Sequence, residues 1–221
     1  MGKKKKHTRK KNAPKSQAPS KGGAVKVSQL SDREILSRLE AMGISTSKEA
    51  FRAEASGSAS LGDIRKEWST RIKKSAKADA RFLEKALTEL WHRFLPERPS
   101  VEMIDRWMQE GYEYAEQGDD ARAAEIWLVT LRALESRFTE TIRSTAEADK
   151  LFNGLESIGE WLLDFIETLR DLAEQKPRYA ETGVQVCDLL LARFTGEDPE
   201  ILAALRDDRA DFILIQEKQH R

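Results

Sequence analysis

Apolar side chains recur at every third or fourth position through most of this chain, which is the spacing of one face of an α-helix. The clearest stripe ends at Phe94, just before Pro96 and Pro99, where a helix is expected to stop. Leucine occurs 23 times and alanine 25 times but valine only six times, a balance that favours helices over strands. The sequence therefore predicts an all-α fold. The members of the stripe are Phe82, Leu83, Ala86, Leu87, Leu90, Trp91 and Phe94.

Capping signals predict where the helices begin and end. Ser31 and Glu34 form a capping-box pattern. Asp198 followed by Pro199 combines an N-cap residue with proline at the first helical position. The expected helices cover residues 31–42, 47–56, 61–68, 82–94, 101–117, 121–138, 145–175 (with a bend at Asn153-Gly154), 178–194 and 199–217.

The first 27 residues differ from the rest in composition. Residues 1–26 hold ten lysines and arginines and no acid, whereas the remaining 195 residues hold 28 basic and 38 acidic side chains. With no aromatic residue and few apolar ones, residues 1–27 are predicted to be a disordered basic tail. Such a tail can bind phosphate-rich polymers without sequence preference; a nuclear address, a membrane-surface contact or a merely solvated extension are the alternatives. Its polyanion-binding candidates are Lys3, Lys4, Lys5, Lys6, Arg9, Lys10 and Lys11.

Several classes of protein are disfavoured by the sequence. No apolar run approaches the ~18–20 residues of a membrane span, and the N-terminus lacks the apolar stretch of a signal peptide. Cys187 is the only cysteine, which excludes an internal disulfide and fits a reducing compartment. We therefore expect a cytoplasmic protein, or a nuclear one if the organism is a eukaryote.

A pattern of large and small residues between Trp107 and Trp127 resembles the tetratricopeptide repeat, a pair of antiparallel helices. The separation of Tyr114 from Ala123 is the one found in that repeat. Small residues are needed where two helices approach closely, and glycine can adopt the left-handed conformation that ends a helix. The residues expected to have these structural roles are Trp107, Gly111, Tyr114, Gly118, Ala123 and Trp127.

Two positions depart from the repeat pattern, with Glu110 in place of leucine and Glu135 in place of the terminal proline. More of the chain resembles a group of poorly characterised bacterial helical proteins that often carry tetratricopeptide-like repeats before a SEC-C metal-binding motif. This sequence has no such cluster of cysteines, so we carry over no metal site. The segments behind this second resemblance are Pro99–Asp105, Met108–Tyr112 and Ala148–Gly154.

These features lead to a predicted domain organisation and function. Residues 28–98 are expected to form an N-terminal helical segment, and residues 99–219 a tetratricopeptide-like stack of helical hairpins, an α-solenoid. Such a stack leaves a groove for a peptide or another protein, so we expect an interaction module or scaffold that is not an enzyme. The alternative is an RNA- or ribosome-associated factor bound mainly through the basic tail. The expected groove residues are Arg106, Met108, Tyr112 and Glu116.

The sequence offers few groups for catalysis, cofactors or metals. His7, His92 and His220 lack a second ligand at metal spacing, and Cys187 lies on an apolar stripe, as a buried small hydrophobe does. We therefore expect no metal, no cofactor and no catalytic residue. Asp119-Asp120 is expected at a helix start, and Asp207-Asp208 on a solvated face paired with Arg206 and Arg209.

Two further expectations concern apolar residues. The five tryptophans fit a helical core, with Trp91 and Trp161 the ones expected nearest the rim of a groove. The run Phe212–Ile215 is expected to leave part of the last helix uncovered, and a second copy of the chain is one candidate to cover it.

Overall fold

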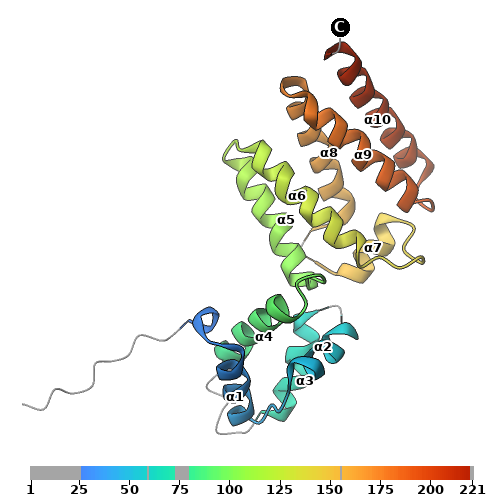
Figure 1. Ribbon diagram of the computed structural model, residues 1–221. Helices are drawn as coiled ribbons and strands as arrows, with labels where there is room; N and C mark the ends of the chain where they lie inside the picture. The colour runs from blue at the N-terminus through green and yellow to red at the C-terminus, as the bar shows by residue number, and fades with distance from the viewer. Residues whose placement is uncertain (1–25, 59, 73–79, 155, 220–221) are drawn as a thin grey trace, which may run out of the picture.

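The structure is a computed structural model that describes residues 26–58, 60–72, 80–154 and 156–219 (Figure 1). Every regular element in these ranges is helical, which confirms the all-α prediction. Residues 1–25 of the predicted disordered tail, with all its polyanion-binding candidates, lie outside the described residues, whereas Val27 is buried in a short helix, so the prediction is wrong at that position. The elements are η1 (Val27–Gln29), α1 (Asp32–Met42), α2 (Lys48–Ser56), α3 (Leu61–Arg71), α4 (Ala80–Phe94), α5 (Val101–Glu116), α6 (Asp120–Glu135), α7 (Thr145–Phe152), α8 (Ile158–Gln175), α9 (Pro177–Arg193) and α10 (Pro199–Gln219).

Polar side chains fix the starts of most of these helices. The Ser31 hydroxyl accepts from the Glu34 amide while the Glu34 carboxylate accepts from the Ser31 amide, so the predicted capping box is present. Gly118, in the turn between α5 and α6, has the left-handed conformation with φ 76°. Side-chain caps of the same kind are made by Ser47, Ser60, Ser100, Asp119 and Ser144.

The single bent helix predicted over residues 145–175 is wrong, because the chain forms two separate helices there. Asn153 ends α7 in the left-handed conformation, with φ 44°, which asparagine tolerates better than most residues. The Asp149 carboxylate then accepts hydrogen bonds from the Ser157 hydroxyl and the Ile158 amide, and so caps the start of α8 from the preceding helix.

The helices η1 to α4 enclose one core. Phe51 lies at its centre, with its ring edge-to-face against Trp68, Trp91 and Phe94. Arg93 of α4 holds the start of this unit, because its guanidinium donates to the Leu30 carbonyl and to backbone and side-chain oxygens nearby. Trp91 is fully buried, so its predicted place at a groove rim is wrong.

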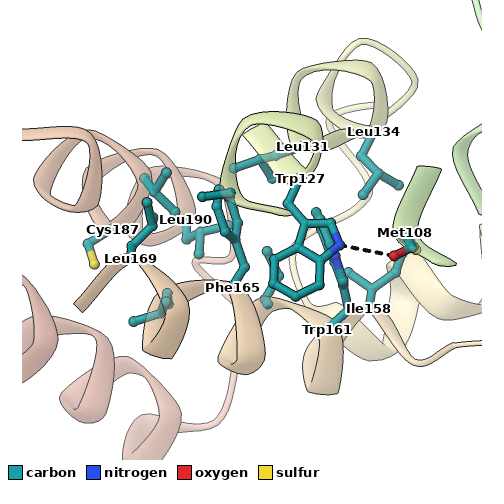
Figure 2. Close-up of a cluster of buried hydrophobic side chains, with 14 of the residues drawn as sticks. Met108, Trp127, Leu131, Leu134, Ile158, Trp161, Phe165, Leu169, Cys187 and Leu190 are labelled. Atoms are coloured by element: carbon teal, nitrogen blue, oxygen red, sulfur yellow. Dashed lines mark hydrogen bonds between the residues drawn. The ribbon is translucent and has the colours of Figure 1, made fainter. Parts of the chain in front are cut away.

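The helices α5 to α10 enclose a second core, in which successive long helices lie side by side (Figure 1). Trp127 of α6 lies at its centre, and its indole Nε1–H donates to the Met108 carbonyl at 3.0 Å (Figure 2). Phe165 contacts Trp127 edge-to-face and stacks on Trp161. Trp161 is also fully buried, so it does not lie at a rim as predicted.

Two glycines allow the helices of this second core to approach closely. A Cβ atom on Gly111 of α5 would lie 2.0 Å from Nε1 of Trp127 on α6, and one on Gly183 of α9 would lie 2.5 Å from the Phe212 ring on α10. Because real side chains do not approach so closely, each of these helix pairs depends on its glycine.

Glu102 joins the two halves of the molecule. This residue of α5 accepts hydrogen bonds from the Ser60 hydroxyl and from the backbone amides of Leu61 and Gly62, which begin α3. The Gly62 amide also donates to the Ser60 hydroxyl, so the Glu102 carboxylate and the Ser60 cap together satisfy the start of α3. Met103 beside it packs against the N-terminal core.

Candidate binding groove

The four residues predicted to line a groove on α5 do not lie on one surface. Met108 is 2 % exposed and packs in the second core, so its side chain is closed to a partner. Arg106 is exposed and lines a hollow beside Glu84 and Thr88 of α4. Tyr112 lies on another side of α5, where its hydroxyl donates to the Asp164 carboxylate of α8 at 2.8 Å.

Tyr112 and Glu116 lie one turn apart on α5. Tyr112 is half-buried and touches Trp127 edge-to-face, while Glu116 is exposed. Burial and the hydrogen bond to Asp164 both raise the pKa of the Tyr112 hydroxyl well above its usual range, so it remains a donor at neutral pH. This hydrogen bond ties α5 to α8.

The residues predicted to shape the repeat lie along the contact between α5 and α6. Ala123 and Trp127 are buried, and Gly111 faces the Trp127 indole. Trp107 and Tyr114 are half-buried, and Tyr114 carries the guanidinium of Arg122 over its ring at 4.5 Å.

An apolar hollow lies between α8 and α10, two helices that both pack on α9. Its volume is about 480 Å³, within the range of about 300–1,000 Å³ common for ligand pockets. Leu190 and Phe194, at the end of α9, are buried beneath it. The other apolar residues that line it are Leu162, Leu163 and Ile166 of α8 and Ile201, Ala204 and Leu205 of α10. We call this hollow the α8–α10 groove.

Two large apolar side chains of the groove are open to solvent. Leu163 is 57 % exposed and Ile201 is 42 % exposed, although each belongs to a helix that buries other apolar residues. Exposed apolar side chains gathered around a hollow are typical of binding sites, whereas single ones scattered over a surface need no explanation. Leu163 and Ile201 both line the same hollow, so they are gathered as in a binding site rather than scattered.

Carboxylates line the edges of the groove. Glu160 and Glu200 lie at the starts of α8 and α10, and Glu197 lies in the turn before α10. One Glu197 oxygen accepts a hydrogen bond from the Thr145 amide, which fixes this turn against the start of α7. The edge is therefore both acidic and held in place by backbone contacts.

Asp208, also at the groove, is paired across helices. The sequence predicts ion pairs within residues 206–209, but Asp208 pairs with Arg170 of α8 and Arg209 with Asp188 of α9. Burial raises the pKa of the Asp208 carboxyl, while Arg170 opposes that rise. These pairs fasten α10 to its two neighbours, α8 and α9.

The sequence does not predict this groove, because its repeat-like pattern points to α5 instead. One signal was present: Leu163 does not belong to the apolar stripe of its helix, which runs through Ile158, Leu162, Phe165 and Ile166. A large apolar residue outside the core-facing stripe, among acidic residues, indicates an apolar side chain exposed to solvent. The partner residues from α10 could not be found in this way, because their position depends on how α10 packs.

Other candidate groups lie apart from the groove. Cys187 is fully buried, which confirms its predicted place in the core, and burial raises the pKa of its thiol to about 12. His92 is exposed on α4. Among the described residues, no group of three or more histidine, cysteine or acidic side chains is arranged to hold a metal ion. In the same ranges no helix combines the length and the apolar character needed to cross a membrane.

Comparison of the chain with protein-family models, with curated proteins and with solved structures finds no match.

Proposed function

We propose that this protein is a non-enzymatic interaction module that binds another protein in the α8–α10 groove. The observation that carries the proposal is the apolar hollow of about 480 Å³ with the exposed Leu163 and Ile201 on its two sides. Burying such side chains against a partner removes apolar surface from water, at about 25 cal/mol per Å². The groove lies on helices that are fixed by ion pairs and core packing, so it is formed before the partner arrives.

The arrangement of the C-terminal helices supports a tetratricopeptide-like solenoid for residues 99–219. Helices α5 and α6 form one hairpin, α8 and α9 form a second, and α10 packs on α9 and α8 as the next helix of the series. In such a stack each hairpin contacts mainly its neighbours, and the first helices of successive hairpins border the binding groove. Under this assignment α5, α8 and α10 are those first helices, and the groove lies between the last two.

The basic tail gives the protein a second mode of contact. Seven of the nine residues from Lys3 to Lys11 are lysine or arginine, which favours salt-sensitive attraction to a polyanion. We propose that this attraction acts separately from the groove and holds the protein near a nucleic acid or another polyanion. The alternative function, an RNA- or ribosome-associated factor bound mainly by the tail, rests on the same run of residues.

Affinity capture from a native lysate, with and without nuclease, tests both functions. Three forms are compared: the full chain, a Leu163→Lys/Ile201→Lys variant, and a chain without residues 1–26. We expect proteins that remain after nuclease treatment, that the chain without its tail still captures, and that the groove variant loses. Capture that disappears with nuclease or with the tail, and that the groove variant retains, would instead establish the alternative.

A further inference from the structure

The exposed face of α8 carries one sign of charge. Apart from Leu163 and the terminal Gln175, every exposed residue of this helix is acidic. Glu160 lines the groove, Asp164 accepts a hydrogen bond from Tyr112 of α5, and the others continue the same face at helical spacing. A partner in the groove that reaches over Leu163 therefore meets their field. We call these residues the acidic face: Glu160, Asp164, Glu167, Asp171 and Glu174.

The opposite edge of the groove has the same sign. Glu197 and Glu200 line it, and Arg170 and Arg209 are engaged with Asp208 and Asp188. A partner that brought further carboxylates would meet like charge on both edges, which costs affinity. A partner with lysine or arginine on both sides of its apolar contact would gain at each edge.

The lining of the groove also restricts the backbone of the partner. Most lining groups are hydrocarbon, and an extended segment buried there would leave its amides and carbonyls without partners. A helix satisfies these groups internally and presents only side chains. The groove therefore fits a helix better than a strand.

We infer that the α8–α10 groove binds one amphipathic helix of a partner protein, with large apolar side chains in the hollow and lysine or arginine against the acidic face. This inference rests on the proposed function and names the chemistry of its partner. The basic tail of the chain itself matches the charge but not the hollow. Within residues 1–26 the largest apolar side chains are Met1 and Val25, which are 24 positions apart, so the tail cannot present the row of large apolar side chains that one face of a helix would place in the hollow.

The experiment uses the full chain and a fluorescent peptide of leucine and lysine, about 18 residues long so that it can form a helix. Its leucines recur at i, i+3, i+4 and i+7 to make one apolar face. Three control peptides accompany it: a scrambled sequence whose leucines share no face, a version with glutamine for lysine, and a version with glutamate for lysine. Fluorescence anisotropy gives the affinity of each.

We expect the lysine peptide to bind at least about tenfold more tightly than the scrambled, glutamine or glutamate peptide, and to weaken as salt is raised. A Leu163→Ser/Ile201→Ser variant should lose about tenfold or more in affinity. Val129→Ser is its matched control, because Val129 is 51 % exposed but lies on α6, outside the groove, and it should change nothing.

Charge variants test the acidic face directly. Glu160→Lys with Glu167→Lys should weaken the lysine peptide and strengthen the glutamate peptide, whereas Glu181→Lys, an exposed site on α9 outside the groove, should do neither. Both substituted residues are exposed, so folding is expected to be kept, and far-UV circular dichroism checks it.

The contrary outcomes separate this inference from the proposed function. If the glutamine or glutamate peptide binds as tightly as the lysine peptide, and the Leu163/Ile201 variant still loses it, the groove stands and the basic partner is wrong. If the scrambled peptide binds as tightly as the lysine peptide, and the Leu163/Ile201 variant still binds both, then the peptides bind through their charge alone and the inference is wrong. If no peptide binds, the inference is wrong, while the proposed function is decided by whether the Leu163→Lys/Ile201→Lys variant loses its captured proteins.

Discussion

At the scale of single residues, Gly111 makes the sharpest demand. We expect Gly111→Ala to destabilise the protein by about 2–3 kcal/mol, because the new Cβ would overlap the Trp127 indole and push α5 away from α6. This exceeds the ~1 kcal/mol that alanine gains over glycine in a helix. Urea unfolding followed by circular dichroism measures the change.

Gly57→Ala is the matched control for that substitution. Gly57 has an ordinary negative φ of −85°, and the nearest atom to its added Cβ would be 3.5 Å away, so we expect a change within about 0.5 kcal/mol. A Gly111→Ala protein as stable as this control would contradict the close helix contact and, with it, the tetratricopeptide-like assignment.

Glu102 gives a prediction about pH. Burial raises the pKa of its carboxyl, but hydrogen bonds from Ser60, Leu61 and Gly62 lower it by more, so the folded pKa lies below the ordinary value. Its stabilisation is therefore present above the unfolded pKa, near 4.3, and is lost as the pH falls through the folded value. We expect Glu102→Gln to cost about 1–3 kcal/mol at pH 7 and progressively less as the pH falls below about 4.

Unfolding in urea across a pH series checks this difference. Glu113→Gln, at an exposed site on the same helix, should show no such dependence. A Glu102→Gln protein whose deficit is the same at pH 7 and at acid pH would mean that the carboxylate is not what fixes the start of α3.

At the scale of elements, the helices were predictable and their junctions less so. The capping box at Ser31 and the N-cap at Asp198 are local patterns, and the structure confirms both. The sequence predicts only a bend between α7 and α8, because the break depends on a hydrogen bond that the Asp149 carboxylate accepts from the Ile158 amide, nine residues later. The groove depends on how α10 packs against α8 and α9. Apolar periodicity shows which face of a helix is buried but not which other helix it packs against. Hence the helical class could be read from the sequence, whereas the candidate site could not.

The last helix should be the element most sensitive to a single core substitution. Phe212 is fully buried against Gly183 of α9, one turn from Cys187. In the folded protein a thiol that is buried, with a pKa of about 12, should resist a disulfide reagent at pH 8. Phe212→Ala should leave a cavity that lowers the free energy of unfolding by about 3–5 kcal/mol and lets α10 detach more often. We therefore expect the labelling rate of Cys187 to increase at least about tenfold.

Leu214→Ala is the control for this labelling experiment, since Leu214 is 50 % exposed on the same helix. Its rate should stay close to that of the unsubstituted chain. Equal rates for Phe212→Ala and Leu214→Ala would show that α10 does not cover Cys187 as described.

At the scale of the whole molecule, the two cores share no residue. The C-terminal core draws its buried members from Val101 to Phe212, and the N-terminal core from Val27 to Leu95. We therefore expect a fragment of residues 97–219 to fold alone, with cooperative unfolding but lower stability than the full chain, because Glu102 and Met103 lose their contacts with the other half. Circular dichroism during urea unfolding tests this.

A fragment of residues 97–193, which lacks α10, serves as its control. It uncovers the Cys187 face of α9 and should unfold at lower urea or without cooperativity. If the 97–219 fragment behaved no better, the division into segments at residues 28–98 and 99–219 would be wrong.

The buried tryptophans make intrinsic fluorescence a probe of unfolding in this protein. Trp68 and Trp91 lie in the N-terminal core, and Trp127 and Trp161 in the C-terminal core. The N-terminal half thus carries two indoles and the C-terminal half three, because half-buried Trp107 also packs on the C-terminal core. The emission of buried indoles shifts to longer wavelength when water reaches them. Replacing Trp68 and Trp91 by phenylalanine would therefore leave the C-terminal half as the source of the shift, so intrinsic fluorescence can report the opening of that half without any added dye.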